Sequence, residues 1–107
     1  MKTLALALGL ILACTAAVAY GRTPAEIDRE QAHKSYLELD RIKHLVARDA
    51  KRMERAKRAG DTAGEAKWKA EMDKHNAQAR KQKRKVIADR RKADASEERE
   101  RLARQSK

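Results

Sequence analysis

The sequence predicts an all-α protein in which two long helices form an antiparallel, coiled-coil-like hairpin. Two long stretches, residues 25–59 and 65–107, contain neither Gly nor Pro and are rich in helix-forming residues. The short segment between them carries two glycines, and apolar residues recur at helical spacing on both sides of it. The same features are compatible with an oligomer of hairpins, and the alternative is one long charged helix.

Residues 1–19 predict a cleaved export signal. A short positive start, Met1-Lys2, precedes an apolar run of 16 residues, 4–19, which is shorter than the roughly 20 residues that span a bilayer. Ala17 and Ala19 supply the small side chains that signal peptidase accommodates, so we expect cleavage before Tyr20. The mature protein is then periplasmic or secreted and has no spanning segment.

Cys14 is the only cysteine of the chain, and it leaves a second interpretation of the N-terminus open. Residues 11–14, Ile-Leu-Ala-Cys, resemble a bacterial lipobox, in which the cysteine is lipidated and anchors the protein. An uncleaved membrane anchor is a third alternative. If cleavage falls after Ala19, the mature chain has no thiol, which excludes disulfides and cysteine chemistry.

The first helix is predicted over residues 24–59, after a short segment at 20–23. Thr23, Pro24 and Glu26 form a capping box with the proline at the first helical position, which is a specific signal for a helix start. Apolar residues then recur at spacings of three, four and seven. They form a narrow stripe of Leu39, Ile42, Val46, Met53 and Ala56, which Asp49 interrupts.

Residues 60–64 are predicted to be the hinge, with Asp61 or Thr62 capping a second helix over residues 65–93. The second stripe consists of Trp68, Met72, His75, Ala79 and Val86, with Ile87 beside it. Beyond it, residues 94–107 hold only one large apolar residue, so we expect a fraying helical or disordered basic tail.

If the two helices fold back on each other at the hinge, residues face each other when their numbers add to about 122. Met53 then lies near Trp68 and Met72, while Leu39 lies near Val86 and Ile87, and this coincidence favours the hairpin. The residues predicted for packing or self-association, the latter giving a homo-oligomer, are Leu39, Ile42, Val46, Met53, Trp68, Met72, Val86 and Ile87.

Charge provides the main functional indication. Residues 20–107 contain 26 basic and 16 acidic side chains, since Lys2 is the only base before them. Residues 80–92 hold eight bases and one acid, which favours binding to phosphate-rich or carboxylate-rich partners. The predicted anion-binding residues are Arg80, Lys81, Lys83, Arg84, Lys85, Arg90, Arg91 and Lys92.

Two functions follow from these patterns. In the first, the basic surface binds envelope lipid head groups, lipopolysaccharide or an acidic protein. Binding to lipid head groups would bring the protein into contact with a membrane surface. In the second, the protein is a structural or chaperone-like coiled coil that uses its apolar stripe for self-association or client binding. A solvated basic face with no partner is the plain interpretation of the same charge run.

No enzyme, cofactor or metal site is expected. The chain offers no catalytic triad, nucleophile elbow or glycine-rich phosphate loop. The acid and histidine pairs Asp40 with His44 and Glu71 with His75 are predicted to point in different directions, which disfavours a shared metal.

Nucleic acid is not an expected partner. Residues 76–84 resemble part of a bZIP basic region in Asn76, Ala77 and Arg84. The segment departs from that family at Arg80 and Lys83, and no leucine heptads follow it.

Overall fold

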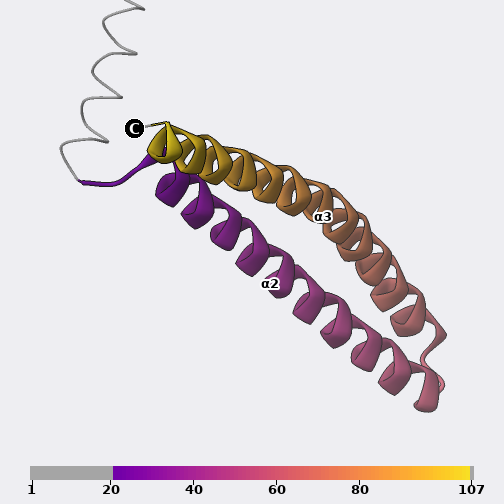
Figure 1. Cartoon of the computed structure of the whole chain (residues 1–107). Helices are drawn as coiled ribbons and strands as arrows, with labels where there is room; N and C mark the ends of the chain where they lie inside the picture. The colour runs from indigo at the N-terminus through magenta and orange to yellow at the C-terminus, as the bar shows by residue number, and fades with distance from the viewer. Residues whose placement is uncertain (1–20, 107) are drawn as a thin grey trace, which may run out of the picture.

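The computed structural model describes residues 21–106, which form two α-helices packed side by side in an antiparallel hairpin (Figure 1). Helix α2 spans Pro24–Arg58, with 35 residues, and helix α3 spans Thr62–Gln105, with 44 residues. The predicted hairpin is confirmed, and the alternative of one continuous helix is wrong because the chain reverses at residues 59–61. The expected signal peptide, its cleavage site and Cys14 lie outside the described residues.

The start of α2 follows its sequence signal. Thr23 is the N-cap, and its hydroxyl accepts a hydrogen bond of 3.2 Å from the backbone N–H of Glu26. Pro24 occupies the first helical position, where its missing N–H has no intrahelical partner to lose. This end of α2 is therefore defined by local chemistry.

The turn is shorter than the predicted hinge. Gly60 has a positive φ of 71°, a conformation that a side chain disfavours, and it follows directly after the last turn of α2. Asp61 caps α3 through a hydrogen bond of 2.9 Å from the N–H of Gly64. Gly64 lies inside the first turn of α3, where glycine is favoured because a Cβ would collide with the capping carboxylate of Asp61.

The C-terminal part of the chain is ordered as helix, which corrects the expectation of a fraying tail. Helix α3 continues to Gln105 because the segment after residue 93 packs on the start of α2. Ala93 and Ser96 are buried, and the Glu100 carboxylate accepts a hydrogen bond of 3.2 Å from the backbone N–H of Ala25. Small side chains provide this contact, so counting large apolar residues did not reveal it.

The register between the helices differs by two residues from the predicted one, since Asp49 faces His75. Leu39, Ile42 and Val86 are buried between the helices. Ile87, which the sequence placed in the packing stripe, is 42% exposed and lies outside the seam. The correction has a simple geometric cause, because residues 86 and 87 point about 100° apart on a helix.

Neither helix within residues 21–106 is apolar enough over its length to cross a membrane. Both are charged along their outer surfaces, and α3 bows visibly along its length in Figure 1. The hairpin is therefore a charged rod with a narrow seam.

Candidate anion-binding surface

The seam between α2 and α3 follows a heptad pattern. Its inward residues recur at alternating spacings of three and four, from Ala25 to Ala56 on α2 and from Trp68 to Glu100 on α3. We label the heptad a to g so that Ala25 and Glu100 occupy position a. Positions a and d then face the opposite helix, and every residue at these positions in the two ranges is buried or half-buried.

Polar groups fill the d positions over much of the seam. The Ser96 hydroxyl donates to the Asp28 carboxylate over 2.5 Å, and the Ser35 hydroxyl donates to the Asp89 carboxylate. Gln82 lies one heptad away from Asp89, and its side-chain amide donates to the Ser35 carbonyl over 2.9 Å. These interhelical bonds satisfy polar groups that would be costly to bury alone.

The most buried of these contacts joins Asp49 and His75. One carboxylate oxygen of Asp49 lies 2.5 Å from His75 Nδ1, and the Asp49 side chain is fully buried while that of His75 is 13% exposed. The other carboxylate oxygen has no hydrogen-bond partner among residues 21–106, and the nearest guanidinium nitrogen, from Arg48, is 3.7 Å away. Asp49, which interrupts the apolar stripe in the sequence, therefore forms a contact between the two helices.

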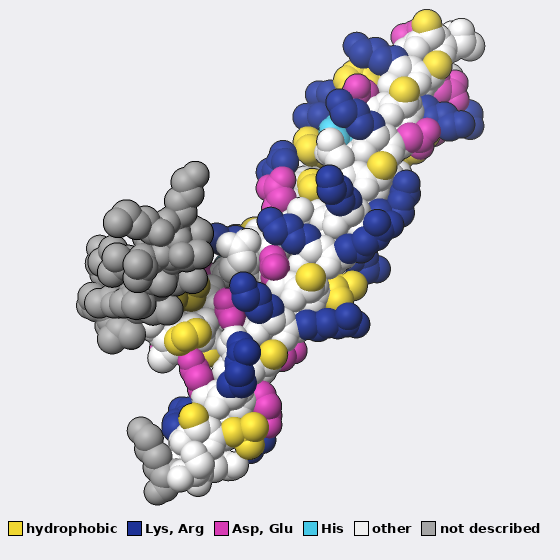
Figure 2. All heavy atoms as spheres, turned by 90° about the horizontal axis from the view of Figure 1, so that it is seen from above, with side chains coloured by type: hydrophobic (Ala, Val, Ile, Leu, Met, Phe, Trp, Pro, Cys, Tyr) yellow, Lys and Arg dark blue, Asp and Glu magenta, His cyan; other side chains and the backbone are white. Residues whose placement is uncertain are grey.

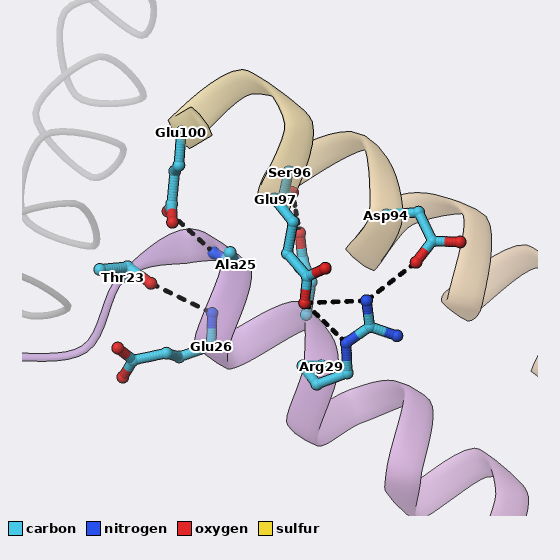
Figure 3. A network of polar contacts seen from close by, with 9 residues as sticks. Thr23, Ala25, Glu26, Arg29, Asp94, Ser96, Glu97 and Glu100 are labelled. Atoms are coloured by element: carbon cyan, nitrogen blue, oxygen red, sulfur yellow. Dashed lines mark hydrogen bonds and ion pairs between the residues drawn. The ribbon is translucent and has the colours of Figure 1, made fainter. Parts of the chain in front are cut away.

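A polar network closes the open end of the hairpin (Figure 3). Arg29 of α2 reaches across to α3, where its guanidinium donates to Asp94 over 2.8 Å and to Glu97 over 2.9 Å. These two hydrogen bonds raise the pKa of Arg29 above its ordinary value, so the guanidinium stays charged. The network ties the last turns of α3 to the first turns of α2.

We expect the substitution Arg29→Gln to loosen the end of α3 without unfolding the hairpin. Gln keeps helix propensity but removes the charge that holds Asp94 and Glu97. Hydrogen exchange should become faster for amides of residues 94–105 and stay unchanged for amides near the turn. Arg101→Gln is the control, because Arg101 pairs with Glu98 on its own helix. Equal exchange in the two variants would contradict this role for Arg29.

The predicted basic run is exposed on α3. All eight of its bases are exposed, and Figure 2 shows basic side chains along the visible face of the rod with acidic ones between them. Within residues 21–106, only Lys92 of these eight forms an ion pair, at 3.8 Å from Asp28. Arg90 stacks over the Tyr36 ring at 5.7 Å. The exposed bases are Arg80, Lys81, Lys83, Arg84, Lys85, Arg90, Arg91 and Lys92.

Seam contacts divide this run. Val86 is buried and Asp89 is half-buried, so the bases between and beside them project from the two flanks and the outer crest of α3. The structure does not gather all eight onto one face. A single flat partner would contact only part of the run.

Sequence reasoning missed a second basic segment, residues 41–58 of α2, which contains eight bases and two acids. Glu38 lies just before it. A hydrogen bond from Arg41 lowers the pKa of the Glu38 carboxyl, and the positive charges of Arg41 and Lys85 add to the effect. The sequence contains this composition, but the segment was missed because its two acids lie among the bases and interrupt the run of positive charge.

The predicted packing residues fall into three groups. Leu39, Ile42 and Val86 are buried in the middle of the seam, and Ile87 is exposed. The remaining four are half-buried and lie toward the turn: Val46, Met53, Trp68 and Met72. Arg52 covers the Trp68 ring at 4.6 Å and Lys67 lies over it at 5.1 Å.

The histidine pairs point apart. His44 lies 3.3 Å from Asp40 on the outside of α2, with 78% of its side chain exposed, whereas His75 faces the seam. Among residues 21–106, no group of three or more potential ligand side chains is placed to hold a metal ion.

Comparisons of the chain with models of protein families, with curated proteins and with solved structures find no significant match.

Proposed function

We propose that this is a small exported protein that binds an anionic partner through its basic surface and catalyses no reaction. The partner classes that fit are envelope lipid head groups, lipopolysaccharide and an acidic protein. Export rests on the pattern of residues 1–19, and the lipid-anchored form through Cys14 is its alternative.

The exposure of the eight bases in residues 80–92 is the observation that supports the proposal most. Seven of its eight bases have no acidic partner within ion-pair distance in residues 21–106, so their charge is available to a ligand. Four of the eight acids of α3 lie after residue 93, where Arg29 and Arg101 pair with Asp94, Glu97 and Glu98. Charge is therefore balanced at the open end and uncompensated in the middle of the rod.

A salt titration tests the proposal. Each phosphate contact releases counterions, so binding of the full chain to immobilised inorganic polyphosphate should weaken at least about tenfold between roughly 50 and 200 mM salt. The variant Arg80→Gln with Arg84→Gln and Arg91→Gln should bind more weakly and show a shallower salt dependence. Failure to bind polyphosphate and anionic lipid vesicles alike at low salt would overturn the proposal.

The alternative function, a structural or chaperone-like coiled coil, has one candidate binding site near the turn. The hairpin uses Leu39, Ile42 and Val86 internally, so a client-binding or self-associating coiled coil would depend on the half-buried residues near the turn. Binding of an acidic protein that is insensitive to salt and abolished by Met53→Ala with Trp68→Ala would favour this function over the first.

A further inference from the structure

Basic side chains recur every seven residues along one flank of the hairpin. They occupy position c of both helices, where the hairpin axis advances about 10.5 Å per heptad. All of them are exposed: Lys34, Arg41, Arg48 and Arg55 on α2, and Lys67, Lys74 and Lys81 on α3. Only one of them, Lys81, belongs to residues 80–92, whereas Arg41, Arg48 and Arg55 belong to the second basic segment, residues 41–58.

Contacts place the two columns on the same flank. Arg41 of α2 and Lys81 of α3 line one groove together with Glu38, Gln78 and Lys85. Closer to the turn, Arg52 and Lys67 from the two helices both lie over the Trp68 ring. Positions c and g of α2 and α3 therefore form one continuous flank, which we call the c/g flank.

The two flanks differ in charge. Positions c and g of residues 24–105 carry eleven bases and two acids, whereas positions b and e carry nine bases and six acids. Ion pairs occur on both flanks, with Arg29 bound to Asp94 and Glu97 on the b/e flank and Arg41 bound to Glu38 on the c/g flank, so the difference lies in the numbers of bases and acids. The excess positive charge of the hairpin is thus concentrated on the c/g flank.

Exposed apolar side chains lie at the open end of the same columns. Ile27 and Leu102 occupy position c, one heptad beyond Lys34 and three heptads beyond Lys81 respectively, and they are 38% and 52% exposed. The flank therefore combines a basic middle and turn end with two exposed aliphatic side chains. This composition suits an interface between water and lipid, where bases meet head groups and aliphatic side chains enter below them.

We propose that the c/g flank lies flat on an anionic lipid surface, an inference that rests on the proposed binding of an anionic partner. The two basic columns belong to different helices, so a planar surface meets both at once, whereas a single polymer strand follows one of them. On this flank Arg52 and Lys67 lie over the Trp68 ring, and the exposed Tyr36 ring contacts Arg90 of the other flank, so the c/g flank presents no free row of aromatic rings among residues 21–106 for a nucleic acid strand to stack on.

The test measures binding of the full chain to vesicles of phosphatidylcholine with about 30% phosphatidylglycerol, and to vesicles of phosphatidylcholine alone. The flank variant carries Arg55→Gln, Lys67→Gln, Lys74→Gln and Lys81→Gln. The matched control removes four bases from position e with Lys43→Gln, Lys57→Gln, Lys69→Gln and Arg104→Gln. Both variants lose four positive charges, retain helix propensity and share the same first 20 residues.

We expect the flank variant to lose about 100-fold in affinity for the anionic vesicles and the control less than about tenfold, because only the flank bases lie at the surface. A second measurement does not depend on any variant. Brominated phosphatidylglycerol should quench the fluorescence of Trp68, the only tryptophan, because Trp68 lies beneath Arg52 and Lys67 of this flank.

Equal losses in the two variants would overturn the inference, as would unquenched Trp68 fluorescence in the bound wild type. Salt-sensitive binding to polyphosphate without preference for anionic over neutral vesicles would also overturn it, while the broader proposed function would stand. No binding to either anion would remove both.

Discussion

The variant His75→Ala should lose about 3 to 5 kcal/mol of stability, because it leaves the carboxylate of Asp49 buried without the one hydrogen-bond partner that it has among residues 21–106. For a hairpin of this size, such a loss corresponds to a Tm lowered by more than about 12 °C. Thermal melts followed by far-UV circular dichroism at neutral pH, at several protein concentrations, measure the effect and separate it from any self-association.

Two further variants show that the effect comes from the unpaired carboxylate. Asp49→Ala with His75→Leu replaces the pair by an apolar layer similar to that of its neighbours, and this double variant should be as stable as wild type or more so. His44→Ala removes an exposed histidine that also has an aspartate partner, Asp40, and should change the Tm by less than about 2 °C. A Tm for His75→Ala within that margin would show that water or Arg48 compensates for the lost contact.

Leu39→Ala should cost about 2 to 4 kcal/mol, whereas Ile87→Ala should cost less than about 0.5 kcal/mol. Leu39 is 6% exposed in the middle of the seam, and its truncation leaves a cavity between the helices. Ile87 is 42% exposed on the outside of α3, so its truncation removes little buried surface and improves helix propensity. Chemical unfolding of the two variants in urea under identical conditions gives both values.

Similar losses for Leu39→Ala and Ile87→Ala would mean that both side chains are buried. Since the hairpin alone leaves Ile87 exposed, that result would require a second copy of the chain to cover it. Measuring the Ile87→Ala melt at two protein concentrations would identify this case.

Local signals in the sequence predicted the start of α2 and the turn well, because caps and turns depend on neighbouring residues, whereas the end of α3 depends on packing against α2 and was predicted too early. Thr23, Gly60 and Asp61 all act as their residue types suggest. The polar contacts across the seam were not predicted. A polar residue on an apolar stripe looks like an interruption until its partner is known, and identifying that partner requires the register between two distant segments.

The same limitation applies to the candidate site. Residues 80–92 can be recognised from the sequence alone, because their bases lie close together along the chain. The c/g flank combines bases seven residues apart on two helices, so it becomes visible only when the helices are placed side by side. The heptad spacing of Lys34, Arg41, Arg48 and Arg55 was a signal available in the sequence that a search for charge clusters passes over.

The polar residues at position d, which bond across the seam, also select one alignment of the helices among those that a seven-residue repeat permits. Sliding α3 by one heptad in one direction would bring the carboxylates of Asp28 and Asp89 together and set Asp49 against Trp68. Sliding it the other way would set Asp89 against Ile42. Alanine layers such as Ala32 and Ala93 discriminate poorly between these alignments, so hydrogen bonding provides the discrimination that large apolar side chains supply in other coiled coils.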